Sequence, residues 1–191
     1  MKKRRNYLAT CFGVVILLLN QSASAEKPYV DVIESLAQQT NNIVKYEETY
    51  EAFYLDEPLK SRGELRFEPP DKLVKTVKEP EFAVQEIEGD EVVVKWENGK
   101  IERFSLEQHR GLKSMAYTLR SLLTGNADYF EKNYQIDYSE NEGNWKLILI
   151  PLDTDVKKWI KDVVIIGENG KLTQYTITEI NGDHTTTRLY E

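Results

Sequence analysis

SRGELRFEPPDKLVKTV, the stretch from Ser61 to Val77, decides how this chain folds. Within it, Leu65 and Phe67 alternate with charged residues, and this period of two is typical of a β-strand with one buried face. Pro69-Pro70 ends the strand, because a proline nitrogen has no hydrogen to donate to a neighbouring strand. Leu73 to Val77 begins the next strand. The stretch therefore predicts two strands joined by a proline corner, at the front of an antiparallel series.

Short apolar segments bounded by turn residues continue along the chain and predict further β-strands. The predicted segments are Ile43–Leu55, Phe82–Ile87, Glu91–Trp96, Ile101–Leu106, Tyr134–Tyr138, Trp145–Ile150, Lys161–Ile166, Leu172–Glu179 and His184–Tyr190. Asn-Gly pairs begin at Asn98, Asn169 and Asn181, and Asn-Gly between such segments is the strongest short-range hairpin signal. Consecutive hairpins predict an antiparallel meander. Gly63 opens the Ser61 strand and leaves room for another group to pack against its backbone.

Helical periodicity is found in the segments Pro28–Gln39, Leu112–Leu123 and Asp128–Asn133. The middle segment carries the widest apolar face, which must be buried against a large apolar partner. We expect this helix to be a lid across the concave side of the sheet, with inward side chains Leu112, Met115, Leu119, Leu122 and Leu123. Lys113 and Arg120 are expected to point outward, and Gly125 to end the helix.

These elements predict an α+β fold that is mainly antiparallel β. A long twisted antiparallel sheet curls on itself, so we expect an unclosed half β-barrel of about eleven strands. Two to three helices are expected to cover its concave face. Residues 26–191 are predicted to form one domain, since no repeat, low-complexity tract or linker divides them.

The first 25 residues have the pattern of a secretory signal peptide. A basic start at Lys2 to Arg5 precedes the apolar run Leu8–Leu19, and Ala23-Ser24-Ala25 is a cleavage site of small residues. The alternative is an uncleaved membrane anchor, which the shortness of the apolar run disfavours. Cys11, the single cysteine, lies in this segment too close to the basic start for a lipidation site. The mature chain is therefore expected to contain no disulfide.

The chain is acidic, with a formal net charge of −7. Removal of the leader would take away four basic residues and no acidic ones, which makes the net charge −11. This charge argues against a nucleic-acid partner and against adsorption to anionic lipid headgroups.

No catalytic motif is present in the sequence, and we expect neither an enzyme nor a cofactor. The histidines are His109 and His184, far apart in the chain, and no glycine-rich phosphate loop or nucleophile elbow occurs. Asp153-Thr154-Asp155 is either a cation ligand or, more simply, a helix cap or polar turn. The carboxylates of Glu47, Glu48 and Glu51 are interpreted as a solvated face rather than a metal site.

The order of these motifs resembles that of the LolA-like periplasmic carriers. Gly63-Glu64-Leu65-Arg66-Phe67 with the proline corner resembles the family's opening strands, and Leu122-Leu123-Thr124-Gly125-Asn126 resembles the end of its central helix. Trp145 to Pro151 resembles its Leu-x-Leu-x-Pro strand, and Gly182-Asp183 with Thr185 and Thr187 resembles its last hairpin. The resemblance covers essentially the whole chain after the leader.

The resemblance implies an unclosed barrel whose apolar interior holds the acyl chains of a lipidated cargo. It also implies a monomer in the periplasm of a Gram-negative bacterium, which takes cargo from an inner-membrane exporter to an outer-membrane acceptor. The pattern departs from the carriers at the corner, where Pro69, preceded by Glu68, stands in place of their arginine. It also ends at Glu191 without their additional C-terminal segment. Rescue of cells depleted of their own lipoprotein carrier is therefore not expected.

Two functions remain open at this point. The first is a carrier of a lipid, lipoprotein or acylated product, and the second is a non-enzymatic periplasmic adaptor or scaffold with a filled core. A connected apolar cavity of several hundred Å³ distinguishes the two. The residues expected to contact lipid are the apolar positions of the sheet and the central helix: Val44, Tyr46, Leu65, Phe67, Phe82, Val84, Val92, Val94, Trp96, Leu119, Leu122, Leu123, Leu147 and Leu149.

Overall fold

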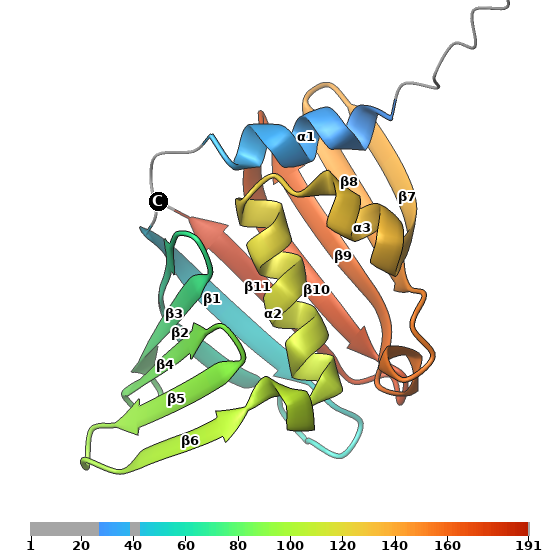
Figure 1. Ribbon diagram of the computed structural model, residues 1–191. Coiled ribbons are helices and arrows are strands. Elements are labelled where there is room, and N and C mark those ends of the chain that lie inside the picture. Colours follow the sequence, from blue (N-terminus) through green and yellow to red (C-terminus); the bar gives the residue numbers. More distant parts are fainter. Residues whose placement is uncertain (1–26, 39–42, 191) are drawn as a thin grey trace, which may run out of the picture.

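The computed structural model describes residues 27–38 and 43–190, and the predicted leader lies outside this part of the chain. Within it, eleven strands form one antiparallel sheet in the order β6-β5-β4-β3-β2-β1-β11-β10-β9-β8-β7 (Figure 1). The strands are β1 (Ile43–Glu51), β2 (Leu59–Glu68), β3 (Lys72–Glu79), β4 (Ala83–Glu88), β5 (Glu91–Trp96), β6 (Ile101–Ser105), β7 (Tyr134–Asn141), β8 (Asn144–Pro151), β9 (Ile160–Glu168), β10 (Lys171–Glu179) and β11 (His184–Tyr190). The prediction of an unclosed, mainly antiparallel sheet of about eleven strands is confirmed.

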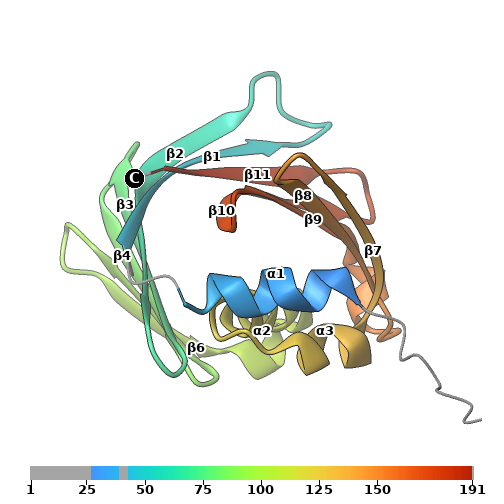
Figure 2. The ribbon, with the colours of Figure 1, turned by 90° about the horizontal axis from the view of Figure 1, so that it is seen from above.

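The helices lie across the open side of the curved sheet (Figure 2). They are α1 (Pro28–Leu36), α2 (Arg110–Leu123) and α3 (Ala127–Asn133), with the short 3₁₀ turns η1 (Leu106–Gln108) and η2 (Val156–Lys158). Pro28 stands at the first turn of α1, where a missing N–H costs nothing. The side chain of Asn126 caps α3 by accepting a hydrogen bond from the backbone N–H of Tyr129 at 3.2 Å. In the described part of the chain, no helix is long and apolar enough to cross a membrane.

Two meanders make up the sheet and meet where β1 pairs with β11. Strands β1 to β6 form the first meander and β7 to β11 the second, each built from neighbours in sequence. The β9–β10 turn shows the local cause, because Asn169 and Gly170 both have positive φ, +49° and +75°. That is the backbone of a two-residue hairpin turn, which Asn-Gly adopts readily. The β1–β11 pairing, from Lys45 opposite Tyr190 to Glu51 opposite His184, joins the first strand to the last.

Strand boundaries differ from the sequence prediction on both sides of the first turn. The predicted strand Ile43–Leu55 ends at Glu51, because its partner β11 begins at His184, opposite Glu51. Tyr54 therefore lies in the loop rather than on the strand, and its hydroxyl is 2.8 Å from that of Tyr50. Strand β2 begins at Leu59, so Gly63 lies in its middle and not at its start.

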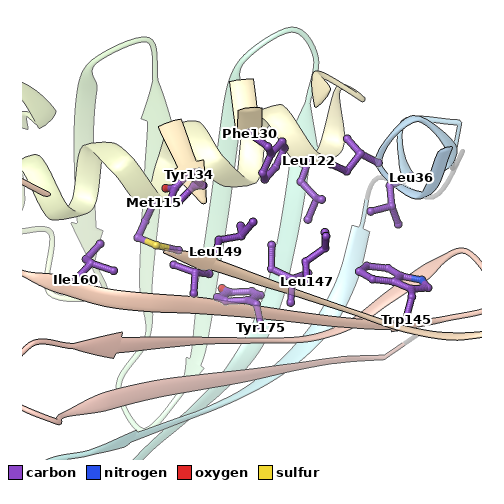
Figure 3. Close-up of a cluster of buried hydrophobic side chains, with 13 residues drawn as sticks. Leu36, Met115, Leu122, Phe130, Tyr134, Trp145, Leu147, Leu149, Ile160 and Tyr175 are labelled. Atoms are coloured by element: carbon purple, nitrogen blue, oxygen red, sulfur yellow. The ribbon is translucent and has the colours of Figure 1, made fainter. Parts of the chain in front are cut away.

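The half of the barrel formed by β7 to β10 is filled with side chains. Figure 3 shows Leu122 and Phe130 of the helices pointing toward Leu147 and Tyr175 of the strands. The members of this core are Ile33, Leu36, Met115, Leu122, Phe130, Tyr134, Trp145, Leu147, Leu149, Ile160, Val163, Ile165 and Tyr175. The opposite half, next to β1–β4, is less completely filled and contains a cavity.

Candidate functional site

An apolar cavity of about 310 Å³ lies between α2 and the sheet. Strands β1 to β4, β10 and β11 form its wall, and α2 with the end of α1 forms its cover. Most of the lining side chains are apolar: Leu36, Ala37, Val44, Leu65, Phe67, Pro69, Leu73, Val74, Ile87, Leu112, Met115, Ala116, Leu119, Leu123, Leu172, Tyr175, Ile177 and Leu189. The polar lining residues are Glu48, Arg66, Lys75 and Gln85.

Some of the residues expected to contact lipid do line this cavity. They are Val44 of β1, Leu65 and Phe67 of β2, and Leu119 and Leu123 of α2. The two strands supply these side chains because Val44 pairs with Leu65, and both point to the concave face. The opening stretch of the sequence and the central helix thus meet across one space.

The other expected residues lie elsewhere. Leu122, Leu147 and Leu149 are fully buried in the filled core. Val92 and Val94 belong to a small second cluster with Leu106 and Ala116.

Four more expected positions lie outside the cavity wall. The ring of Trp96 stacks under the ammonium of Lys100 at 4.7 Å, Phe82 is exposed, and Tyr46 is buried. On β4 the wall is formed by Gln85 and Ile87 rather than by Val84, and Phe82 precedes this strand. Alternate residues of a strand face opposite sides, so Val84 lies on the face of β4 opposite to Gln85 and Ile87.

Several lining residues were not among the predicted lipid contacts, and four of them come from the second meander. Leu172, Tyr175 and Ile177 of β10 and Leu189 of β11 belong to short mixed segments with no distinctive pattern. They reach the cavity because β11, the last strand, pairs with β1, the first. The alternation of inward and outward side chains along β1 could have identified them, because paired residues of β11 and β10 face the same side of the sheet.

Helix α2 covers the cavity and is attached to the β4–β5 turn by polar contacts. Arg120 was expected to point outward, but its side chain is buried and its Nη1 donates a hydrogen bond to the carbonyl oxygen of Gly89 at 2.8 Å. The Tyr117 hydroxyl donates to Asp90 Oδ1 at 3.2 Å, and the Lys113 ammonium lies 3.5 Å from the other oxygen of Asp90. The prediction that Arg120 points into solvent was wrong, because the β4–β5 turn covers the outer face of α2.

We expect Arg120→Ala to loosen α2 while leaving the strands protected. The substitution removes a buried, charge-assisted hydrogen bond, which contributes about 1–3 kcal/mol to the local opening free energy of the helix. Hydrogen exchange of the α2 amides measures that free energy. Arg110→Ala is the matched control, because this arginine of the same helix makes an exposed pair with Asp155 and should change little. Equal exchange in both variants would contradict the attachment.

A polar pair stands in the cavity wall at the junction of the two meanders. The ammonium of Lys75 lies 2.6 Å from Oε1 of Glu48, and Thr187 donates a hydrogen bond to Oε2 of Glu48 at 3.0 Å. The Lys75 ammonium also lies 4.9 Å from the centre of the Tyr46 ring. The interpretation of Glu48 as part of a solvated face was therefore wrong. Glu48 shares the parity of Val44 and Tyr46, which points it into the barrel.

Tyr175 adds a neutral hydroxyl-bearing ring to this wall. Burial raises the pKa of its phenol well above the ordinary value, and the nearby Glu48 carboxylate acts in the same direction. The wall near the pair therefore holds one cation and one anion, and Arg66, the other charged lining residue, is paired with Glu68 at 3.0 Å.

Nothing in residues 27–38 and 43–190 gathers three or more metal-ligating side chains. Asp153 acts as a turn cap, because its Oδ1 accepts hydrogen bonds from the backbone N–H groups of Asp155 and Val156. His109 precedes α2 and packs against the ring of Phe104, while His184 begins β11 beside Glu51. The cavity, with its mainly apolar lining and the Glu48–Lys75 pair in its wall, is suited to hold a ligand.

No curated protein matches this chain. Among solved structures, a LolA superfamily protein from Nitrosomonas europaea is 10% identical, with 86% of this chain and 91% of that chain covered and a TM-score of 0.43. An outer membrane lipoprotein-sorting protein domain from Vibrio parahaemolyticus is 12% identical over 85% and 90% of the two chains, with a TM-score of 0.41. LprF from Mycobacterium bovis is 10% identical over 86% and 93%, with a TM-score of 0.39.

The family assignment rests on the match of the sequence itself, because the TM-scores all lie below 0.5. The family model described as outer membrane lipoprotein carrier protein LolA-like matches residues 22–190. This chain therefore belongs to the LolA-like family of outer membrane lipoprotein carrier proteins.

Proposed function

We propose that the protein is a periplasmic carrier that binds the acyl chain of a lipid, lipoprotein or acylated product in the cavity under α2. It moves this cargo between membranes, and it acts by binding rather than by catalysis. The observation that carries the proposal is the apolar cavity between the β1–β4 wall and a helix held by contacts at its outer face. Membership of the LolA-like family and the leader-like first 25 residues support it.

The energy of such binding comes from the hydrophobic effect. Each CH₂ group that leaves water contributes about 0.8 kcal/mol, so a long acyl chain binds usefully without any charged contact. The cavity, at about 310 Å³, lies at the lower end of the range for small-molecule sites. A chain longer than this space would displace α2 outward, and the attachment of α2 to the β4–β5 turn would then act in loading.

A filled scaffold is the second candidate, and the densely packed β7–β10 half is the observation that favours it. In that half the same types of apolar residue simply pack against one another. The cavity beside β1–β4 is what a scaffold does not need, so binding experiments decide between the two functions.

The proposal predicts that lipid copurifies with the protein from the periplasm and that the purified protein takes up a fluorescent fatty acid. Native mass spectrometry detects the first and fluorescence titration the second. Leu65→Trp should fill part of the cavity and weaken uptake about tenfold, since space for about two CH₂ groups is lost.

Val84→Trp is the matched control, because Val84 lies on the same sheet with Thr76 and Lys95 as its neighbours and outside the cavity wall. It should leave uptake unchanged. A protein that carries no lipid and takes up no acyl probe would sink the carrier and leave the scaffold.

A further inference from the structure

The cavity wall contains an ion pair where apolar side chains would serve an acyl chain better. The side chains of Glu48 and Lys75 are 20% and 23% exposed, so both charges have lost most of their water. Removal of water from two charges consumes much of the energy that their attraction provides, and apolar replacements are often neutral or stabilising. Packing alone therefore gives no reason for this pair, which suggests that it serves the cargo.

The pair retains hydrogen-bond donors beyond the one that joins Lys75 to Glu48. A lysine ammonium has three N–H groups, and one of them is directed at Glu48 Oε1. Gln85 stands directly opposite Lys75 in the β3–β4 register, and both side chains belong to the cavity lining. Cross-strand partners lie about 5 Å apart at Cβ, so both donors border the same part of the cavity wall.

The pair is neutral as a whole, and the positive charge of the lining residue Arg66 is balanced by Glu68 at 3.0 Å, so the wall favours an uncharged oxygen. A carboxylate near Lys75 would lie close to the carboxylate of Glu48 and would lose its own water in an apolar cavity. A carbonyl oxygen accepts the same hydrogen bonds without a net charge. The ring of buried Tyr46 under the ammonium further restricts where Lys75 can move.

We propose that Lys75 and Gln85 bind the carbonyl oxygen of an acyl ester or amide, and that Glu48 excludes free fatty acids. This inference rests on the proposed carrier function and names its substrate class: acyl chains already joined to a larger molecule. The acyl chain extends from this point along the apolar side of α2, toward Leu119 and Leu123.

The test compares the affinities of palmitate and methyl palmitate for the full-length protein at pH 7. Each competes with a neutral fluorescent polyene probe. We expect the ester to bind at least about tenfold more tightly than the acid, the equivalent of one hydrogen bond against one repulsive contact. Glu48→Gln leaves Lys75 as an unopposed cation and should shift the ratio toward the acid by about tenfold or more. Lys75→Gln should weaken the ester and exclude the acid further.

Matched variants separate charge from folding. Glu86→Gln with Lys95→Gln removes an ion pair of the same 2.6 Å length that lies outside the cavity wall, and it should leave the ratio unchanged. The double variant Glu48→Gln with Lys75→Gln removes both charges and should still bind the polyene probe. It should keep only the preference for the ester that comes from the loss of water by the carboxylate of the acid.

The outcomes distinguish the two claims. Two results overturn the inference and leave the carrier function intact. In one, the wild-type protein binds the probe but does not prefer the ester to the acid. In the other, Glu48→Gln does not change the ratio of the two affinities. Failure of probe, acid and ester alike to bind removes the carrier function, and the inference falls with it.

Discussion

Leu147→Ala is expected to lower the free energy of unfolding by about 2–5 kcal/mol, as large-to-small changes in tightly packed cores do. Leu147 lies on β8 with no exposed surface, in the filled half of the barrel. Its side chain points toward the helix residues above it (Figure 3). Urea denaturation followed by circular dichroism measures the change.

Leu119→Ala is the matched substitution on the other side of the same interior. Leu119 borders the cavity, so its neighbours are already missing on one side and the new space joins an existing one. We expect a markedly smaller loss of stability than for Leu147→Ala. Equal losses would mean that the space under α2 is packed like the rest of the core.

Gly63→Ala is expected to destabilise the protein by about 3 kcal/mol, the upper part of the usual range for overpacking. A Cβ at Gly63 would collide with the carbonyl oxygen of Thr76 on the neighbouring strand and lie 3.1 Å from the Tyr46 ring. The obstacle includes backbone, which cannot rotate away, and it sits where β2 and β3 show a register shift. Urea denaturation again provides the measurement.

Gly111→Ala is the control with the opposite expected sign. Its Cβ would meet only ordinary contacts, the nearest 3.7 Å away at Trp159, and alanine favours the helical backbone of α2. We expect stability to rise by roughly 0.5 kcal/mol. If both alanines had the same effect, the close approach at Gly63 would not be what limits the site.

Much of the fold follows from local pattern. The proline corner, the Asn-Gly turns and the wide apolar face of α2 are properties of neighbouring residues, and the structure contains all of them. The closeness of another group to Gly63 was also predictable, although its position within β2 was not. The candidate site was predictable only where two strong signals met, at Leu65 and Phe67 of the opening stretch and at Leu119 and Leu123 of the helix.

The remainder depended on which segments lie side by side. A strand pattern identifies two faces but not which neighbour each face meets, so Leu147 and Leu149 could be assigned to the cavity as easily as to the core. The burial of Arg120 depended on the β4–β5 turn closing over α2. Neither fact is a property of the segment in which the residue lies.

The sequence by itself determined that this chain forms a long antiparallel meander with an apolar helix to cover it, because turns and periodicity act over a few residues. Only the tertiary structure decided that one half of the interior is filled and the other open. It also decided that Glu48 points into the open half beside Thr187, 139 positions away in the chain. The physical reason is the β1–β11 pairing, which brings the first and last strands together. Its register places Glu48 opposite Thr187, so both side chains lie on the same face of the sheet.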